Sequence, residues 1–166
     1  MVSDLFNLRT QLGFYKAYHH NTVNVMIHSV FVPTIFVTSC MILDRIPVFN
    51  NWSLTDVLSI PFATYYIILH RVVGLMASAL IMLILYYVKQ RNTSLKLEAG
   101  IWFTSWLFQF IGHGVFEKRK PALLDNLVQS LVLAPYFIFF EFLFVLGFYS
   151  EIDDQLKRDL KESKDV

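Results

Sequence analysis

The chain has 166 residues and a net charge of +1, and 55% of its residues are hydrophobic and 16% aromatic. Its mean hydropathy of +0.50 is too high for an ordinary soluble domain of this length, which indicates a small polytopic membrane protein. The basic residues are dispersed or lie at the ends of apolar runs, so the sequence offers no case for a nucleic-acid partner. The single cysteine, Cys40, rules out an intrachain disulfide and a cysteine-based zinc site.

The N-terminal part of the chain predicts one surface helix and one spanning helix. Residues 1–20 mix polar and aromatic side chains with leucines at helical spacing, which suits a helix on the membrane surface or one that caps the bundle. Asn21 is a suitable N-cap for the first spanning helix, over residues 23–43. After a polar loop, Thr55 or Asp56 can cap the segment that follows.

The middle and end of the chain contain three further apolar stretches. Residues 57–88 are long enough for two short segments or one tilted helix, but His70 and Arg71 lie at their centre. A charged arginine at the bilayer centre costs roughly 2.5 to 3.5 kcal/mol, so we expect a break there. A short apolar segment over 101–116 and a last spanning candidate over 126–148 follow.

These stretches predict an all-α fold, a polytopic membrane helical bundle with four to five apolar segments. Basic loops flank residues 101–116 on both sides, so five short spans and two full spans followed by a re-entrant segment both remain open. We expect residues 1–150 to form one membrane-embedded domain. Residues 151–166 then form a solvated, charged C-terminal tail, most simply a short amphipathic helix.

The motif with most chemical content is WLFQFIGHGVFEKRKP, residues 106–121. On a helix, Gln109, His113 and Glu117 recur every four residues, which places an amide, an imidazole and a carboxylate on one face. The glycines on both sides of His113 remove side-chain bulk, so that a ligand or another backbone can approach closely. The alternative is a histidine at the membrane interface beside a solvated basic loop.

The chain has five histidines: His19, His20, His28, His70 and His113. Imidazoles together with a carboxylate such as Glu117 suit ferrous iron with open positions for oxygen and substrate, and ligand type alone also permits zinc. A continuous helix would separate His20 from His28 by roughly 12 Å along its axis. Either the chain therefore folds back at Asn21, or these histidines serve different centres. Each could also be a polar anchor for helix packing.

Other polar residues have two interpretations each. The basic run Lys118, Arg119 and Lys120 can bind a substrate carboxylate or anchor the chain at the membrane surface. Gln109 can line a cavity or form a hydrogen bond between helices. Glu141, inside the last apolar stretch, needs a partner or a proton. The sequence contains no Ser-His-Asp elbow, phosphate-binding glycine loop or dinucleotide fingerprint.

Two blocks carry a family resemblance: LRTQLGFYKAYHHNTVNVMIHSVFVPT near the N-terminus, and WLFQFIGHGVFEKRKPALLDNLVQSLVLAPYFIFFEFLF. Together they resemble the fungal 2-hydroxy fatty acid dioxygenases of the endoplasmic reticulum, a family with uncharacterised bacterial membrane relatives. The resemblance implies an Fe(2+)-dependent enzyme in the endoplasmic reticulum membrane that shortens a long-chain 2-hydroxy fatty acid by one carbon during phytosphingosine breakdown. The partners implied are that acid, O2 and membrane lipids, without a nucleotide cofactor.

The resemblance also assigns residues. It implies that the iron ligands are His19, His20, His28 and His113. It places His113 and Glu117 at the catalytic centre. The substrate would be held by Gln109, Lys118, Arg119 and Lys120. Converting a 2-hydroxy acid to the shorter acid, carbon dioxide and water releases four electrons, which one O2 accepts, so the reaction needs no 2-oxoglutarate or nicotinamide.

Two alternatives come from other functional classes. A helical bundle with paired histidines can bind haem and carry electrons. A membrane scaffold or lipid-binding protein would use the same histidines only for packing.

Overall fold

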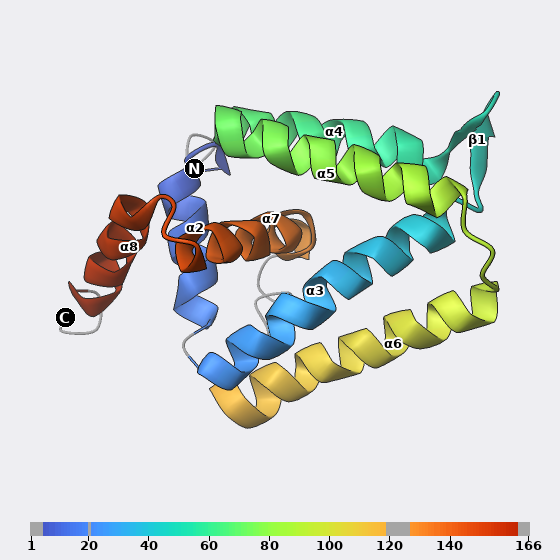
Figure 1. Ribbon diagram of the computed structural model, residues 1–166. Helices are drawn as coiled ribbons and strands as arrows, with labels where there is room; N and C mark the ends of the chain where they lie inside the picture. The colour runs from blue at the N-terminus through green and yellow to red at the C-terminus, as the bar shows by residue number, and fades with distance from the viewer. Residues whose placement is uncertain (1–4, 20, 119–126, 163–166) are drawn as a thin grey trace. The chain divides into compact units, whose positions relative to one another are not determined.

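The computed structural model describes residues 5–19, 21–118 and 127–162 (Figure 1). Its elements in chain order are α2 (Leu8–Tyr18), α3 (Thr22–Leu43), β1 (Pro47–Phe49), β2 (Trp52–Ser53), α4 (Leu54–Leu69), α5 (Arg71–Lys89), α6 (Leu95–Ile111), the π-helical turn η1 (Gly112–Glu117), α7 (Leu127–Val145) and α8 (Ser150–Glu162). The predicted all-α class is confirmed, apart from the antiparallel pair of short strands β1 and β2.

Contacts within the chain divide it into two compact units. The terminal unit comprises the described residues of Met1–His28 and Ile111–Val166, and the central unit comprises Ser29–Phe110. The first turns of α3 belong to the terminal unit and the rest of that helix to the central unit. Each unit is described separately below.

In the central unit, α4 and α5 lie side by side as a helical hairpin (Figure 1). The predicted break is confirmed, because α4 ends at Leu69 and α5 begins at Arg71. The helices approach so closely that a Cβ on Gly74 would lie 2.2 Å from the carbonyl oxygen of Tyr66, so only glycine fits there. The predicted cap of α4, Thr55 or Asp56, was wrong by two or three residues: Ser53 is the N-cap, and Asp56 completes its capping box.

The helices α3 and α6 also contact each other within the central unit. The rings of Phe31 and Phe108 stack with centroids 4.5 Å apart, and Trp102 Nε1 donates a hydrogen bond to Ser39 Oγ at 2.9 Å. Helix α6 begins at Leu95, earlier than the polar stretch before residue 101 suggested, because the carboxylate of Glu98 in its first turn pairs with Arg45 and Arg91.

Six charged side chains join helix ends of the central unit, and we call them the ionic cluster: Asp44, Arg45, Asp56, Lys89, Arg91 and Glu98. Glu98 is only 1% exposed, and its Oε1 lies 2.6 Å from Arg45 Nη2 and 3.0 Å from Arg91 Nε. The Arg45 guanidinium lowers the pKa of Glu98 to about 2. Asp44 and Asp56 pair with Lys89 at 3.3 and 2.8 Å. The three acids thus balance the three bases.

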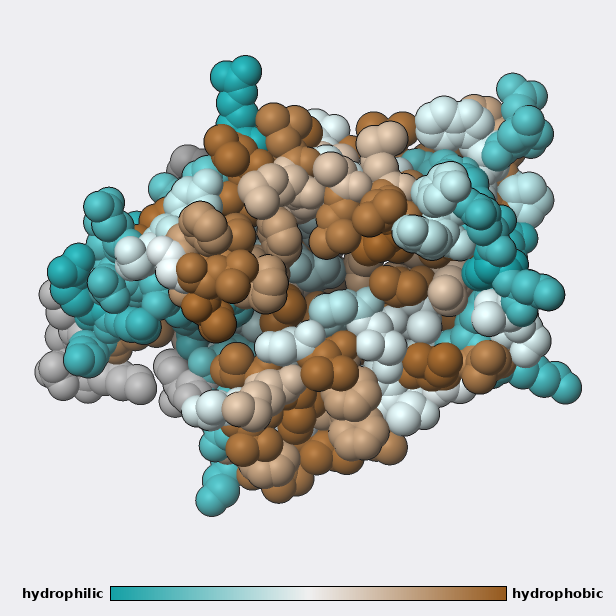
Figure 2. Space-filling model, in the orientation of Figure 1, coloured by the Kyte–Doolittle hydropathy of each residue, from teal (hydrophilic) through white to brown (hydrophobic). Residues whose placement is uncertain are grey.

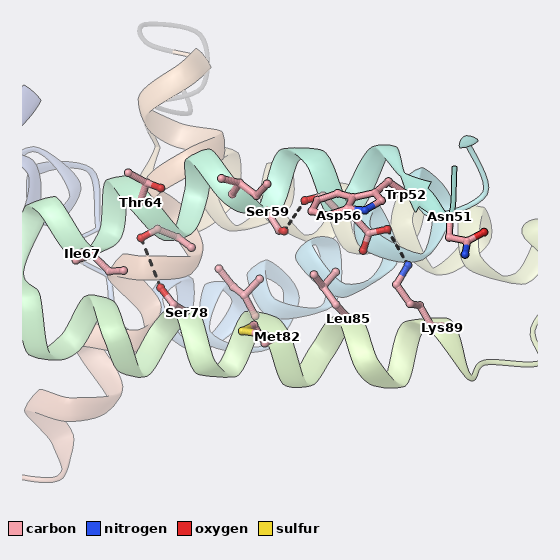
Figure 3. A pocket seen from close by; sticks show the side chains of 13 residues that line it. Asn51, Trp52, Asp56, Ser59, Thr64, Ile67, Ser78, Met82, Leu85 and Lys89 are labelled. Carbon is pink, nitrogen blue, oxygen red and sulfur yellow. Dashed lines mark hydrogen bonds and ion pairs between the residues drawn. The ribbon is translucent and has the colours of Figure 1, made fainter. Parts of the chain in front are cut away.

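The surface of the α4–α5 hairpin is largely apolar. Figure 2 shows hydrophobic residues over the hairpin and hydrophilic ones near its end at the ionic cluster. Met82 is 72% exposed and Tyr87 64% exposed, as expected for helices that face lipid. A groove of about 530 Å³ runs between the two helices, with apolar side chains such as Ile67 and Leu85 along it and the Lys89–Asp56 pair at one end (Figure 3).

Membrane association follows from the apolar helices. Among the described helices, α3 and α5 are long and apolar enough to cross a membrane, and a third span is possible if α7 and α8, bent by 110°, form one broken segment. The hairpin partner α4 is apolar but shorter, with 16 residues. The structure thus supports two to three spans by length and composition, and the predicted four to five segments are not confirmed as spans.

In the terminal unit, α2 packs against α7 and α8. Leu12 is 1% exposed, and the ring of Tyr15 lies 4.8 Å from that of Phe137 on α7. The predicted C-terminal helix is present as α8, but one face of it is buried, since Leu156 is 1% exposed. The partner that Glu141 requires is Lys16, whose Nζ lies 3.4 Å from its carboxylate.

Candidate metal centre

Three of the predicted ligands meet in the terminal unit. His19 directly follows the last residue of α2, His28 lies two turns into α3, and His113 is the second residue of η1. One nitrogen atom from each imidazole lies within 4.8 Å of the other two, and we call these residues the histidine cluster. Because His19 and His28 belong to one cluster, they serve one centre, which agrees with the alternative in which the chain folds back near Asn21.

Backbone carbonyls orient two of the three imidazoles. His19 Nδ1 lies 2.8 Å from the carbonyl oxygen of Tyr15, and His28 Nδ1 lies 2.9 Å from that of Asn24. A carbonyl oxygen only accepts, so each Nδ1 carries the proton and each Nε2 presents a lone pair. Fixing the ring through the far nitrogen is the usual way in which proteins prepare a histidine to bind metal.

His113 completes the cluster from a different part of the chain. It is 5% exposed, and its Nε2 lies 3.1 Å from Nε2 of His28. Its own Nδ1 is buried without a hydrogen-bond partner in the described part of the chain. The π-helical turn ends at Lys118, which adopts a left-handed conformation with φ of 53°. His113 therefore lies in the last, π-helical turn of this helical segment.

Glu117 contacts the start of α3. Its Oε1 accepts hydrogen bonds from the backbone N–H of Asn21 at 2.8 Å and from Asn24 Nδ2 at 3.1 Å. The cluster of potential ligands among the described residues contains the three histidines and not this carboxylate. A role for Glu117 as a ligand or acid–base group stays a prediction.

The two glycines beside His113 differ. A Cβ on Gly112 would lie 2.3 Å from Asn24 Oδ1, whereas a Cβ on Gly114 would meet nothing within 4 Å. Close approach of another residue is therefore a feature of the first glycine alone.

Within the histidine cluster, the spacing of His28 and His113 matches that of two ligands on one divalent transition metal. Nitrogen ligands about 2.1 Å from one ion, at angles of about 90° to 110°, lie roughly 3.0 to 3.4 Å apart. The 3.1 Å between His28 Nε2 and His113 Nε2 falls in this interval. Imidazole donors without thiolate suit iron or zinc.

Comparison with known proteins identifies the family. Residues 5–146 match the family model described as 2-hydroxy-palmitic acid dioxygenase Mpo1-like. The chain is 52% identical over 163 residues to the 2-hydroxy-palmitic acid dioxygenase MPO1 of Saccharomyces cerevisiae, covering 97% of this chain and 94% of that protein. The chain belongs to the Mpo1-like family. No solved structure matches it.

The remaining predicted site residues of this Mpo1-like chain are placed as follows. Lys118 is exposed, and Gln109 is a buried residue of α6 in the central unit. His20, Arg119 and Lys120 lie outside the described residues. The fifth histidine, His70, is the N-cap of α5 and accepts a hydrogen bond from the Val73 N–H.

Sequence reasoning missed the contribution of Asn24 to the Mpo1-like site. This side chain is fully buried, and its backbone and amide contact His28 and Glu117 respectively. A signal was available: Asn24 and Tyr15 each precede a cluster histidine by four residues, the spacing at which a carbonyl meets a side chain on the next turn. The link to Glu117 carries no such local signal.

Proposed function

We propose that this chain is a non-haem, Fe(2+)-dependent dioxygenase that converts a long-chain 2-hydroxy fatty acid to the fatty acid one carbon shorter. The observation that carries the proposal is the convergence of His19, His28 and His113, with one nitrogen atom each within 4.8 Å. The family and the name of the yeast relative support the reaction class.

The proposed reaction balances without another redox partner. R-CHOH-COOH and O2 give R-COOH, CO2 and H2O, because the four electrons released by the acid are those that O2 accepts. If held by these histidines, ferrous iron would supply open coordination positions at which O2 and the 2-hydroxy acid could react. Absence of nucleotide-binding motifs in the sequence agrees with this balance.

Residues of this chain would have three roles. His19, His28 and His113 hold the metal, with His19 and His28 oriented by the carbonyls described above and His20 as a further predicted ligand. Glu117 and His113 are the predicted catalytic groups. The predicted substrate contacts are Gln109, Lys118, Arg119 and Lys120, of which the three basic residues suit a carboxylate. Apolar helices would receive the acyl chain.

The proposed location is the endoplasmic reticulum membrane, with several spans, and the proposed pathway is the degradation of phytosphingosine. The apolar helices α3 and α5 support membrane insertion. A membrane site suits this reaction, since a long-chain acid partitions into the bilayer and can reach the enzyme from there.

Product analysis tests the proposal. Purified protein is given 2-hydroxypalmitate and O2, with and without ferrous iron, beside a His113→Ala variant whose fold has been verified. The expected result is the 15-carbon acid, formed only with iron and only by the parent protein.

Well-folded, iron-loaded protein that forms no product would overturn the proposal. A Soret band in that protein would then favour haem binding, and unchanged lipid turnover in the His113→Ala variant would favour a scaffold.

A further inference from the structure

The three imidazoles of the histidine cluster come from different segments, so contacts between these segments must hold the imidazoles together. His28 and His113 are separated by 85 residues, yet their Nε2 atoms lie 3.1 Å apart. The π-helical turn that carries His113 is only six residues long and leads into a left-handed residue. The turn continues α6, so it is a helix terminus, which frays unless contacts with its neighbours hold it.

Glu117 supplies such a contact from the end of the same turn. Its Oε1 accepts from the Asn21 N–H, one of the donors at the start of α3, at 2.8 Å. The same oxygen accepts from Asn24 Nδ2 at 3.1 Å. Donors at a helix start have no partner within the helix, and the helix dipole favours an anion there. The carboxylate is therefore in a good position to hold η1 against α3.

Asn24 connects this contact to the metal ligands. Its exposed fraction is zero, its amide donates to Glu117, and its backbone carbonyl fixes Nδ1 of His28. Its Oδ1 also packs closely against Gly112, the residue before His113. A Cβ on this glycine would lie only 2.3 Å from that oxygen. One buried side chain thus touches the segments that carry two of the three ligands.

We propose that Glu117 and Asn24 form a positioning clasp that sets the distance between His113 and His28 before metal binds. This inference rests on the proposed function, because it assigns the clasp to the same metal centre. In it, Glu117 acts as a hydrogen-bond acceptor and not as a metal ligand, so an uncharged acceptor of similar shape can replace it. Toward the metal, Glu117 and Asn24 are positioning residues, and iron affinity and hydrogen exchange test that role separately from any catalytic role of Glu117.

The experiment compares Glu117→Ala with Glu117→Gln in full-length protein. The glutamine carbonyl can still accept from Asn21 and Asn24, whereas alanine cannot. Hydrogen exchange at the Asn21 amide is measured in metal-free protein, and ferrous iron affinity is measured by titration. Glu151→Ala, at an exposed position of α8, is the matched control for loss of one carboxylate.

The clasp predicts opposite results for the two variants. Glu117→Ala should lose protection of the Asn21 amide and bind iron roughly 10- to 100-fold more weakly, the usual effect of removing support behind a ligand. Glu117→Gln should keep the protection and bind iron within roughly fivefold of the parent, because only the charge–dipole attraction is lost. Glu151→Ala should match the parent.

Two results would overturn the clasp. Equal loss of iron affinity in both variants would identify Glu117 as a ligand or an essential charge. Full protection of the Asn21 amide in Glu117→Ala would show that the Glu117 contact does not hold η1 against α3. Because that exchange measurement needs no metal, it tests the clasp even if the parent protein binds no iron, the result that would refute the proposed function.

Discussion

The histidine cluster and the ionic cluster both gather polar side chains in an apolar protein, but they differ in what is left to bind. In the ionic cluster three acids face three bases, and Glu98 alone contacts two guanidinium groups. In the histidine cluster three nitrogen donors converge, and no carboxylate belongs to the group among the described residues. A balanced network stabilises a fold, whereas converging donors of one kind provide a site for a cation.

Removing a cluster histidine should show most clearly that the two clusters have different roles. His28→Ala deletes a proposed ligand, so iron affinity and formation of the shortened acid should fall by more than roughly 100-fold, beyond the loss caused by changes behind a ligand. The matched control is His70→Asn, which keeps a capping side chain at the start of α5 and should keep iron affinity. Metal titration and product analysis check both variants, and equal losses in the two would remove the distinction.

Removing Glu98 should have the converse effect, a loss of stability without a loss of iron affinity. Glu98→Ala removes the carboxylate shared by Arg45 and Arg91, and Arg91 keeps Asp44 as its ionic partner, so the free energy of unfolding should fall by about 2 kcal/mol. The iron affinity of the folded protein should stay unchanged. Thermal unfolding in detergent and iron titration measure the two effects, with Lys96→Ala, at an exposed position in the same turn, as a control. Loss of iron affinity at normal stability would mean that the ionic cluster has another role.

The two glycines beside His113 should differ by a smaller amount. Gly112→Ala places a Cβ against Asn24 Oδ1, and we expect a loss of about 1 to 3 kcal/mol in stability together with weaker iron binding. Gly114→Ala meets open space, so it should leave iron binding unchanged and stabilise the turn by up to about 1 kcal/mol. Similar unfolding midpoints for the two variants would contradict the close packing of Asn24.

The smallest effect is expected in mild acid. The pKa of Glu98 is about 2 in the folded chain, below its ordinary 4.5, because of the Arg45 guanidinium. The folded state therefore binds this proton more weakly, so the stabilisation is complete above pH 4.5 and is lost as the pH falls through 2. Unfolding midpoints measured from pH 6 to pH 3 should fall more steeply for the parent than for Glu98→Gln. Parallel curves would contradict the assignment.

Features that depend on the free energy of a single residue or a local cap were predictable from the sequence. The break at His70 and Arg71 followed from the cost of a charge at the bilayer centre. The capping role of Asn21 was also predictable, whereas the spacing of the histidines left a fold-back near Asn21 as one of two alternatives. The convergence of His19 and His28 with His113 was anticipated from residue type and family resemblance.

Features that depend on pairing between distant segments were not predictable. Asn24 and Glu117 are 93 residues apart, and neither carries a signal that names the other. The sequence placed Gln109, His113 and Glu117 on one helical face, but the α-helix gives way to a π-helical turn at Gly112, which changes that register. The burial of one face of α8 also depends on α2, so composition alone indicated a solvated helix.

The origin of the ligands on three separate segments has a consequence for the lifetime of the protein. An ion bound by His19, His28 and His113 binds only the folded chain, and at 100 times its dissociation constant it adds about 2.7 kcal/mol of stability. If that ion is the proposed ferrous iron, the chain would open more often and be degraded faster under iron starvation. Cellular abundance of the enzyme would then follow iron supply, without any change in transcription.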